Sequence, residues 1–381
     1  MEINELRQNI DEIDKELVDL FLKRMAISAE VAEYKRNIGM PVFDPSRERA
    51  LLERVSNLSG EDFEGYTRTL YSTILNLSRS YQHKILDHSS KTYKQIENAL
   101  ENTTKVFPER ATIACQGVEG AYSQLAAEKL FSVPSIMFFS SFDAVFSAIE
   151  SGMCKYGILP IENSTAGSVK QVYDLMISKK FKIVRSVRIK IDHNLLAKDG
   201  VALSDIKEIF SHPQAIEQCS EFLSSLPRDV KITKVENTAA AAKMVAESGR
   251  RDIASLSSRS CASQYGLSVV KSSVQDNENN HTRFICISKE LEIYPGADRT
   301  SLMLVTPHKP GALYKMLSRF NAHGINLVKL ESRPLPQRDF EFMFYFDLES
   351  SVYSSKLATL LAELECECDD FTYLGTYSEV I

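Results

Sequence analysis

Apolar residues recur along the first forty positions at the spacing of a long amphipathic helix. Residues three and four apart share one face of an α-helix, and this face is apolar from Ile3 to Tyr34. Two further helix patterns follow, one after an Asp-Pro pair that is typical of a helix start at Asp44, and one from about Asp62. Strand signals are almost absent here, so the pattern predicts an all-helical domain over residues 1–100.

Between residues 108 and 290, short apolar runs alternate with helix patterns, which predicts an α/β domain. Segments such as ATIACQGVEGAYS, YGILPIENSTAG and EIFSHPQAIEQ each lead from a strand through a turn into a helix start. Helix starts bind anions, and ligands of open α/β sheets lie beyond the carboxyl ends of the strands. A serine, threonine or asparagine at a single helix start is usually only a helix cap. Their repetition predicts a polar cleft for a small anion.

Residues 298–381 follow the order strand, helix, strand, strand, helix, strand, which is typical of a ferredoxin-like α+β domain. The polar segment ENTTKVFPER and the Pro-Gly pair in LEIYPGADR mark the joints between the three segments. A chain of 381 residues has room for three such domains.

Composition excludes several classes of function. A net charge of −6 lacks the basic field of nucleic-acid-binding proteins, and no apolar run reaches the length of a membrane span. The acidic, helix-periodic start differs from a signal peptide, and seven scattered cysteines indicate a reducing compartment. We expect a cytoplasmic protein without nucleic-acid or membrane partners. Because no phosphate loop, metal-ligand spacing or G-x-S-x-G motif occurs, we expect no cofactor and no metal.

One cation interrupts the apolar face of the first helix. Arg24 occupies a position where the repeat requires an apolar side chain, and an unpaired buried charge costs about 3–5 kcal/mol. Lys35 lies eleven residues further and shares the same stripe, whereas Arg7 lies about 25 Å away along the helix. Arg7 therefore cannot join Arg24 and Lys35 in one pocket, but the Arg7 of a second, antiparallel chain could.

This pattern, with a D-x-x-R-E at the second helix and an S-x-x-x-Q on the third, resembles the all-helical chorismate mutase domain. The resemblance implies an interlaced homodimer in which Arg7 reaches into the partner's site. It also implies a chorismate site made of Arg7, Arg24, Lys35, Asp44, Arg47, Glu48, Ser78 and Gln82.

The rearrangement of chorismate to prephenate is pericyclic, so it depends on positioning and charge stabilisation rather than on a nucleophile. Arginine suits bidentate carboxylate binding. The resemblance implies that three arginines hold the carboxylates, namely Arg7, Arg24 and Arg47. It further implies that Lys35 and Gln82 donate to the breaking ether oxygen, while Glu48 accepts from the hydroxyl.

A second motif, DNENNHTRF, gathers hydrogen-bond donors where a strand-like run begins. With GVEGAYS, PIENSTAGSV and SHPQAIEQC in that order, it resembles prephenate dehydratase, which has two α/β lobes around a cleft, like a periplasmic binding protein. Prephenate loses its ring hydroxyl and ring carboxylate together and becomes aromatic. The resemblance implies a prephenate site made of Glu162, Asn163, Ser164, Gln214, Thr282, Arg283 and Phe284.

By the same resemblance, Thr282 assists the departing hydroxyl and Arg283 anchors or polarises a carboxylate. The proton donor stays open between Thr282, Glu162 and a bound water. His212 and His281 fit a structural role as well as an acidic one. We assign a catalytic role to neither histidine.

Two short signatures in the last segment resemble the regulatory ACT domain of phenylalanine-sensitive dehydratases. They are Gly311-Ala312-Leu313 and Glu331-Ser332-Arg333-Pro334, although the glycine and proline also fit a helix start and a strand end. The resemblance implies L-phenylalanine bound between two such domains. Tyr314 stands where the family commonly has valine, which leaves the shape of the effector pocket open.

The whole chain therefore resembles bifunctional chorismate mutase–prephenate dehydratases with an ACT domain. The first domain makes prephenate, the second consumes it, and the third senses phenylalanine. Two alternatives are that only one activity is retained, or that the chain is a non-catalytic sensor of a small acid. The donor set of NNHTRF favours catalysis over sensing. The expected partners are chorismate, prephenate, L-phenylalanine and further copies of the chain, in a homodimer or higher homo-oligomer.

Overall fold

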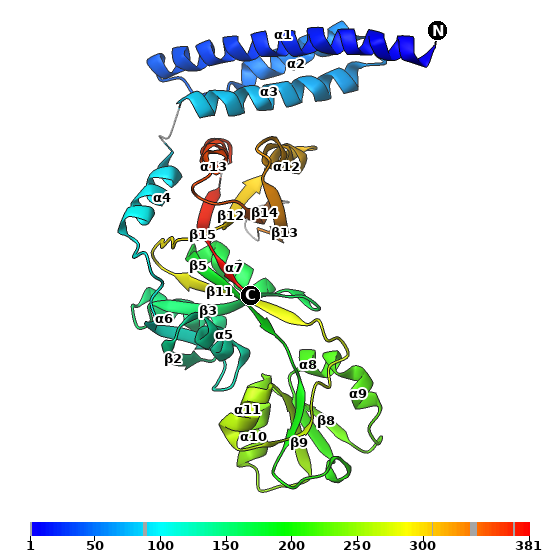
Figure 1. The fold of residues 1–381 in the computed structure, drawn as a ribbon, viewed down its shortest axis with the longest axis vertical. Coiled ribbons are helices and arrows are strands. Elements are labelled where there is room, and N and C mark those ends of the chain that lie inside the picture. Colours follow the sequence, from blue (N-terminus) through cyan, green and yellow to red (C-terminus); the bar gives the residue numbers. More distant parts are fainter. Residues whose placement is uncertain (1, 87–89, 307, 336–340, 369) are drawn as a thin grey trace. The chain divides into compact units, whose positions relative to one another are not determined.

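The computed structural model describes residues 2–86, 90–306, 308–335, 341–368 and 370–381 (Figure 1). The chain divides into two compact units. One contains Met1–Asn98 and Met303–Phe371, and the other contains Ala99–Leu302 and Thr372–Ile381. The helical start of the chain and most of its last segment therefore belong to one unit.

The N-terminal part is all-helical, as its apolar periodicity predicts. It consists of α1 (Ile3–Ile38), α2 (Pro45–Ser59) and α3 (Glu64–Leu86), and α3 packs against the other two helices. Asp44 caps α2, since its Oδ1 accepts from the backbone N–H of Ser46 at 3.1 Å and of Arg47 at 3.0 Å.

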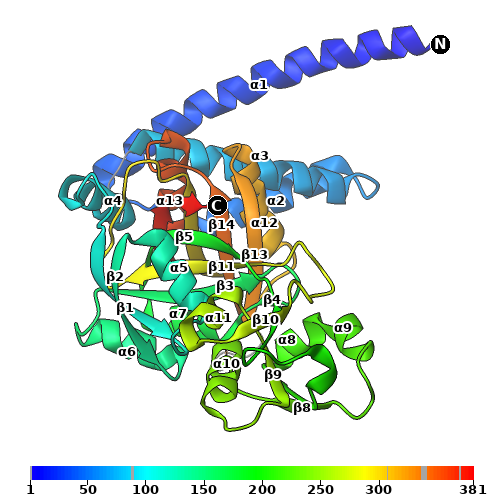
Figure 2. The same cartoon turned by 60° about the horizontal axis from the view of Figure 1, so that its bottom comes forward.

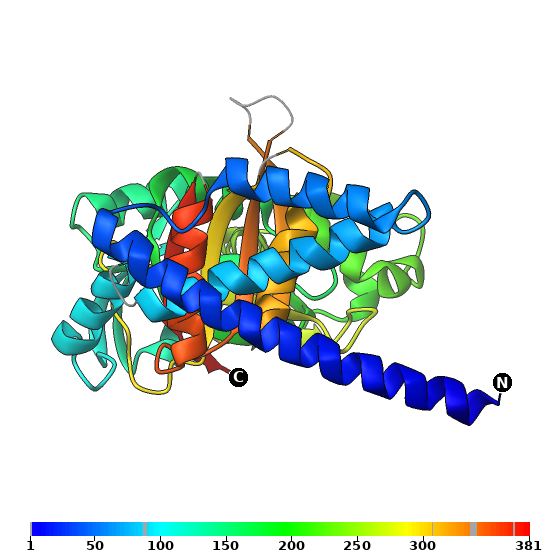
Figure 3. The same ribbon diagram turned by 90° about the horizontal axis from the view of Figure 1, so that it is seen from above.

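Much of the apolar face of α1 is uncovered in the single chain. Figures 2 and 3 show the N-terminal part of this helix extending beyond α2 and α3. Ile13 is 57% exposed and Leu20 is 61% exposed, while Ser28 and Ala32 are buried. Large apolar side chains of α1 are therefore exposed to solvent in the single chain.

The last segment forms a four-stranded sheet with the strand order β13-β14-β12-β15, so β13 and β15 are its edges. Helices α12 and α13 pack against α3 of the N-terminal part. The elements follow the strand-helix-strand-strand-helix-strand order along the chain: β12 (Arg299–Thr306), α12 (Ala312–Ala322), β13 (Asn326–Pro334), β14 (Phe342–Glu349), α13 (Ser355–Glu367) and β15 (Phe371–Tyr377).

The second unit has two α/β lobes, which confirms the predicted class. After the linking helix α4 (Lys91–Asn102), the first lobe is built on a mixed sheet with the order β16-β5-β11-β3-β1-β2, and β4 pairs with β3. Its elements are β1 (Arg110–Gln116), α5 (Tyr122–Leu130), β2 (Val133–Phe139), α6 (Phe142–Glu150), β3 (Tyr156–Asn163), β4 (Gly167–Ser168), α7 (Lys170–Lys179), β5 (Lys182–Lys190), β11 (His281–Ser288) and β16 (Glu379–Val380).

The second lobe is built on a five-stranded sheet with the order β10-β6-β9-β7-β8. The chain enters this lobe after β5 and returns through the segment before β11. Its elements are β6 (Asn194–Ala197), a 3-10 helix (Leu203–Asp205), β7 (Glu208–Ser211), α8 (Pro213–Gln218), α9 (Ser220–Ser224), β8 (Lys231–Lys234), α10 (Thr238–Glu247), β9 (Ile253–Ser257), α11 (Arg259–Tyr265) and β10 (Ser268–Lys271).

A glycine sets how closely the two lobes approach each other. Gly120 has a φ of +83° in the turn before α5, and a Cβ there would lie 2.8 Å from the Sγ of Cys261 in α11. Both the backbone conformation and this contact favour glycine. The second glycine of GVEGAYS is therefore required by the lobe contact, beside the cleft that its motif predicts.

In the part of the chain that the structure describes, no helix combines the length and apolar character needed to cross a membrane. Six described cysteines are free thiols: Cys115, Cys154, Cys219, Cys261, Cys286 and Cys368.

Candidate active sites

A cavity of about 320 Å³ lies among α1, α2 and α3. The stripe of α1 contributes Arg24 and Lys35, and one turn of α3 contributes Ser78 and Gln82. The cavity is thus built by helix periodicity, as the sequence predicts. Seven of the eight predicted chorismate residues line it: Arg24, Lys35, Asp44, Arg47, Glu48, Ser78 and Gln82.

This helical cavity is rich in positive charge. Five cationic side chains line it against the two carboxylates of Asp44 and Glu48: Arg24, Lys35, Arg47, Arg54 and Arg79. Two buried polar atoms, Arg24 Nη1 and Gln82 Oε1, have no hydrogen-bond partner among the described residues. Buried polar groups are normally satisfied. Arg24 Nη1 is a donor that a carboxylate of a ligand would satisfy, and Gln82 Oε1 is an acceptor that a ligand hydroxyl would satisfy.

The structure adds Arg79, which our sequence analysis missed. Its buried guanidinium forms an ion pair with Glu48 and also contacts the side chain of Asn76. Glu48 is therefore already engaged, and Arg79 would direct its carboxylate toward a ligand. The sequence contained a signal for Arg79. An arginine within the helix that has the S-x-x-x-Q pair interrupts the apolar periodicity of that helix, as Arg24 interrupts that of the first helix.

Arg7 lies on an exposed part of α1 and is not among the residues that line the cavity of its own chain. This placement agrees with the distance along the helix. In the single chain, Arg7 therefore does not contribute to this cavity.

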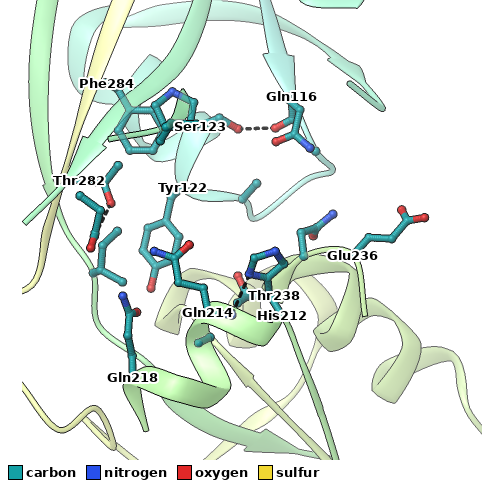
Figure 4. Close-up of a pocket in the computed structure, with 18 of the residues that line it drawn as sticks. Gln116, Tyr122, Ser123, His212, Gln214, Gln218, Glu236, Thr238, Thr282 and Phe284 are labelled. Atoms are coloured by element: carbon teal, nitrogen blue, oxygen red, sulfur yellow. Dashed lines mark hydrogen bonds between the residues drawn. The ribbon is translucent and has the colours of Figure 1, made fainter. Parts of the chain in front are cut away.

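The second unit contains a cavity of about 410 Å³ that residues from both lobes line (Figure 4). One lobe supplies Gln116, Tyr122 and Ser123, and the other supplies Gln218 and Thr238. Four of the seven predicted prephenate residues line this cavity: Asn163, Gln214, Thr282 and Phe284.

Thr282 and Asn163 form a pair at one wall of this cavity. They are register partners in the antiparallel β3–β11 ladder, and Asn163 Nδ2 donates to Thr282 Oγ1 at 3.0 Å. The same amide also donates to Asn280 Oδ1 at 2.7 Å. Since Thr282 Oγ1 accepts from the amide, its own proton is directed elsewhere and can serve a ligand in the cavity.

Three predicted residues do not line this cavity. Successive side chains of a strand point to opposite faces, so Arg283 and Glu162 turn away when Thr282 and Asn163 face the cavity. Arg283 is only 3% exposed, and its Nη1 lies 3.2 Å from Glu162 Oε1. Ser164 instead fastens the turn after β3, since it donates to the carbonyl oxygen of Asn279 at 3.1 Å.

Sequence analysis missed several residues that line the cavity, including Tyr122, Gln218 and His193. Tyr122 donates from its hydroxyl to the carbonyl oxygen of Asp192 at 2.9 Å, and His193 Nε2 lies 3.0 Å from Gln218 Oε1. The i, i+4 spacing of Gln214 and Gln218 places both amides on one face of α8, and this spacing was a usable signal.

Amides, hydroxyls and imidazoles make up most of the polar lining of this second cavity. The described residues that line it include one carboxylate, Glu236, and no lysine or arginine. Helix α5 begins at the cavity with Tyr122 and Ser123, and no side chain caps its first turn. Its free backbone N–H groups and helix dipole favour a carboxylate there. Burial lowers the pKa of His193 and of His212, which keeps both imidazoles neutral near pH 7.

Comparisons with known proteins agree with this geometry. Residues 6–83 match the family model of chorismate mutase type II, and residues 113–292 match that of prephenate dehydratase. The bifunctional chorismate mutase/prephenate dehydratase of Escherichia coli K12 is 31% identical over 382 residues, which cover 98% of this chain and 95% of that protein. This chain belongs to the bifunctional chorismate mutase–prephenate dehydratases.

Two solved structures each resemble 70% of this family member. Prephenate dehydratase from Arthrobacter aurescens in complex with L-Phe is 28% identical with a TM-score of 0.65, over 70% of this chain and 90% of that chain. GqqA, described as a novel type of quorum quenching acylase, is 30% identical with a TM-score of 0.64, over 70% of this chain and 97% of that chain.

The buried histidines predict that the dehydratase unit loses stability in mild acid. The folded pKa of His193 lies below its ordinary value of 6.5, so the unfolded chain takes up this proton first as the pH falls. The free energy of unfolding should therefore decrease from pH 6.5 downward until the folded imidazole is itself protonated. Replacing His193 with glutamine should reduce this decrease, as measured by denaturant unfolding followed by circular dichroism.

The control is His281→Gln, at a partly exposed histidine of the same unit. An unchanged slope of stability against pH in His193→Gln would contradict the prediction.

Proposed function

We propose that this chain rearranges chorismate to prephenate in its helical cavity and converts prephenate to phenylpyruvate in its two-lobed cavity. Its three functional domains would cover residues 1–100, 108–290 and 298–381. The protein would act in the cytoplasm, in the biosynthesis of phenylalanine. The observation that carries the proposal is that two separate cavities each gather donors for a small dianion. The family of this chain joins the two corresponding activities.

In the helical cavity, Arg24 and Arg47 would hold the two carboxylates of chorismate, together with an Arg7. Lys35 and Gln82 would donate to the ether oxygen, where negative charge grows as the bond breaks. Glu48, oriented by Arg79, would accept from the substrate hydroxyl. The site accelerates the reaction by holding the reactive conformer and by meeting this charge with fixed donors.

The origin of Arg7 supports a homodimer. An antiparallel second copy would cover the exposed residues Ile10, Ile13 and Leu17 of α1. In a two-fold symmetric pair, each chain contributes the same surface, so each Arg7 would enter the other chain's cavity. The site would then be incomplete in a monomer.

In the two-lobed cavity, loss of carbon dioxide supplies the electron pair that expels the ring hydroxyl, and the hydroxyl leaves as water after gaining one proton. Thr282 would donate to this oxygen, held in place by Asn163. The uncapped start of α5 and the amides of Gln214 and Gln218 would bind the carboxylates. Glu162 does not line the cavity, so Thr282 and a bound water remain of the three proton donors that the sequence suggested.

An acyl-transfer activity like that named for GqqA would need an activated nucleophile. Burial raises the pKa of Cys115 and of Cys219 to about 12, so these thiols are not thiolates at neutral pH. The Ser123 hydroxyl, which lines the cavity, donates to the backbone carbonyl oxygen of Gln116 at 2.8 Å. These observations favour elimination over acyl transfer.

The four-stranded sheet would be a ferredoxin-like ACT domain that binds L-phenylalanine. Gly311 begins α12 with a φ of +79°, a conformation that suits glycine, and residues 331–334 end the edge strand β13. The exposed Tyr314 and Val328 lie on elements that carry the two signatures, where a second copy would complete the effector site. The L-Phe-bound relative supports this effector.

The two activities should be separable by single substitutions. Lys35→Ala should lower chorismate mutase turnover by about 10²-fold or more, since it removes a donor needed in the transition state, and should spare the dehydratase. Thr282→Ala should do the reverse. Each variant is the other's control, with prephenate and phenylpyruvate formation followed separately. Loss of both activities in a folded variant, or full dehydratase activity in Thr282→Ala, would contradict the assignment.

Exchange of Arg7 between chains predicts complementation. A chain with Lys35→Ala and a chain with Arg7→Ala should each lack mutase activity as homodimers. In a co-expressed mixture, half of the dimers pair the two variants, and one cavity in each has both Arg7 and Lys35. About a quarter of wild-type mutase activity should then return. If Arg7 served its own chain, the mixture would stay inactive.

The effector site predicts that Ser332→Ala raises the L-phenylalanine concentration for half-inhibition of the dehydratase by about tenfold, which is typical of one lost allosteric contact. Ser318→Ala in α12, whose hydroxyl donates to the carbonyl oxygen of Lys315, is the control. Dehydratase activity is measured against L-phenylalanine concentration at a fixed prephenate concentration. Equal inhibition curves for both variants would contradict the assignment of Ser332 to the effector site.

A further inference from the structure

The end of the chain is part of the sheet that carries Thr282. After Tyr377, the chain forms β16, which pairs in parallel with β5, with Glu379 opposite Ser186. The backbone N–H of Ser186 also donates to the carbonyl oxygen of Ser378 at 3.1 Å. Because β5 also pairs with β11, the last residues lie two strands away from Thr282.

The carboxylate of Glu379 is buried beside three arginines, whose own exposure ranges from 3% for Arg283 to 42% for Arg188. Only 3% of the Glu379 side chain is exposed, and its Oε2 lies 2.8 Å from Arg188 Nη2 and 3.4 Å from Arg299 Nη2. Its Oε1 lies 3.8 Å from Nε of Arg283. One carboxylate therefore neutralises charge in a group of three guanidiniums, of which Arg283 is the least exposed.

A second group of the C-terminal segment holds the same arginine. Arg283 Nη2 donates to the Tyr377 hydroxyl at 3.2 Å, and this hydroxyl lies 2.6 Å from Ser301 Oγ. On its other side, Arg283 pairs with Glu162 of β3. The guanidinium is thus fixed between β3 and the C-terminal segment.

This arrangement lies directly behind the reactive pair. Arg283 is the residue after Thr282 in β11, and Glu162 is the residue before Asn163 in β3. The ion pair on one face of the two strands and the Thr282–Asn163 hydrogen bond on the other face share the same two backbone segments. A shift of the Arg283 side chain is therefore carried to the Thr282 hydroxyl through a single peptide unit.

We propose that Tyr377 and Glu379 are positioning residues for the dehydration of prephenate, and that they act on Thr282 through Arg283. This proposal rests on the proposed role of Thr282. It gives the arginine of the Thr-Arg-Phe triplet a role in orienting its neighbour rather than in binding substrate. It also makes the last residues of the chain a part of the dehydratase site.

The expected effect is on kcat rather than on KM. The carboxylates of prephenate would be held by the start of α5 and by the amides of α8, whereas Tyr377 and Glu379 contact Arg283 of β11. The Thr282 hydroxyl, in contrast, must point at the departing oxygen in the transition state, and small errors in such geometry lower the rate of the chemical step.

Two tyrosines of β15 give a matched pair of variants. Tyr377 and Tyr373 are both buried and each has a hydroxyl with a side-chain partner, but the Tyr373 hydroxyl contacts Thr376 Oγ1 at 2.6 Å. Tyr377→Phe should lower dehydratase kcat by about threefold to tenfold with KM unchanged within twofold, a range typical of one misplaced contact. Tyr373→Phe should leave kcat unchanged, and neither should alter mutase activity.

A double-mutant cycle tests the route through Arg283. Glu379→Gln should lower kcat in the wild-type background and in an Arg188→Met background, but should have no further effect in an Arg283→Met background, because coupled residues are not additive. If Glu379→Gln shows no cooperative unfolding transition, the tyrosine pair decides the question alone.

Equal loss of kcat in Tyr377→Phe and Tyr373→Phe, or an unreduced effect of Glu379→Gln in the Arg283→Met background, would overturn the proposal. Full dehydratase activity of Thr282→Ala would instead overturn the proposed function of the cavity, so the two failures are distinguishable.

Discussion

The antiparallel register between β3 and β11 is the constraint on which the dehydratase site depends. It places Thr282 opposite Asn163 and Arg283 opposite Glu162. One face of the two strands thus offers a hydroxyl and an amide to the cavity, while the other face has a buried ion pair. A slip by one residue would exchange these faces and would put the guanidinium where the departing hydroxyl must be met.

The two cavities would bind doubly negative ligands by different physical means. The helical cavity has five cationic side chains, and two of its polar atoms lack partners in the described part of the chain. In the two-lobed cavity, amides, hydroxyls, neutral imidazoles and an uncapped helix start serve instead. Fixed dipoles stabilise the negative charge of a bound ligand. They also leave no buried cation unpaired when the cavity is empty between turnovers. That difference fits a rearrangement that retains both carboxylates and an elimination that releases one.

Periodicity placed Arg24 and Lys35 on one stripe and Ser78 and Gln82 one helical turn apart. It was the resemblance to chorismate mutase that joined these residues into one predicted site. Two of the dehydratase motifs lie on β3 and β11, two strands that border the two-lobed cavity. A contiguous motif alone does not determine which of its side chains face the ligand. Alternation along β11 separates Thr282 from Arg283, and the partners of Arg283 include Tyr377, nearly a hundred residues away. A local sequence pattern cannot predict the contact between Arg283 and Tyr377, because the contact forms only when the C-terminal segment pairs with the sheet.

The junction of β15 and β16 links the four-stranded sheet covalently to the strand that pairs with β5. Strand β15 is an edge of the four-stranded sheet, and only Ser378 separates it from β16 in the dehydratase sheet. Gly375 makes the close approach possible, since a Cβ at its φ of +145° would lie 2.4 Å from the carbonyl oxygen of Ile183 in β5. An effector inhibits only if it binds one arrangement of the protein more tightly than another. An arrangement in which Tyr377 and Glu379 were displaced would remove two contacts of Arg283, the residue that in our proposal orients Thr282.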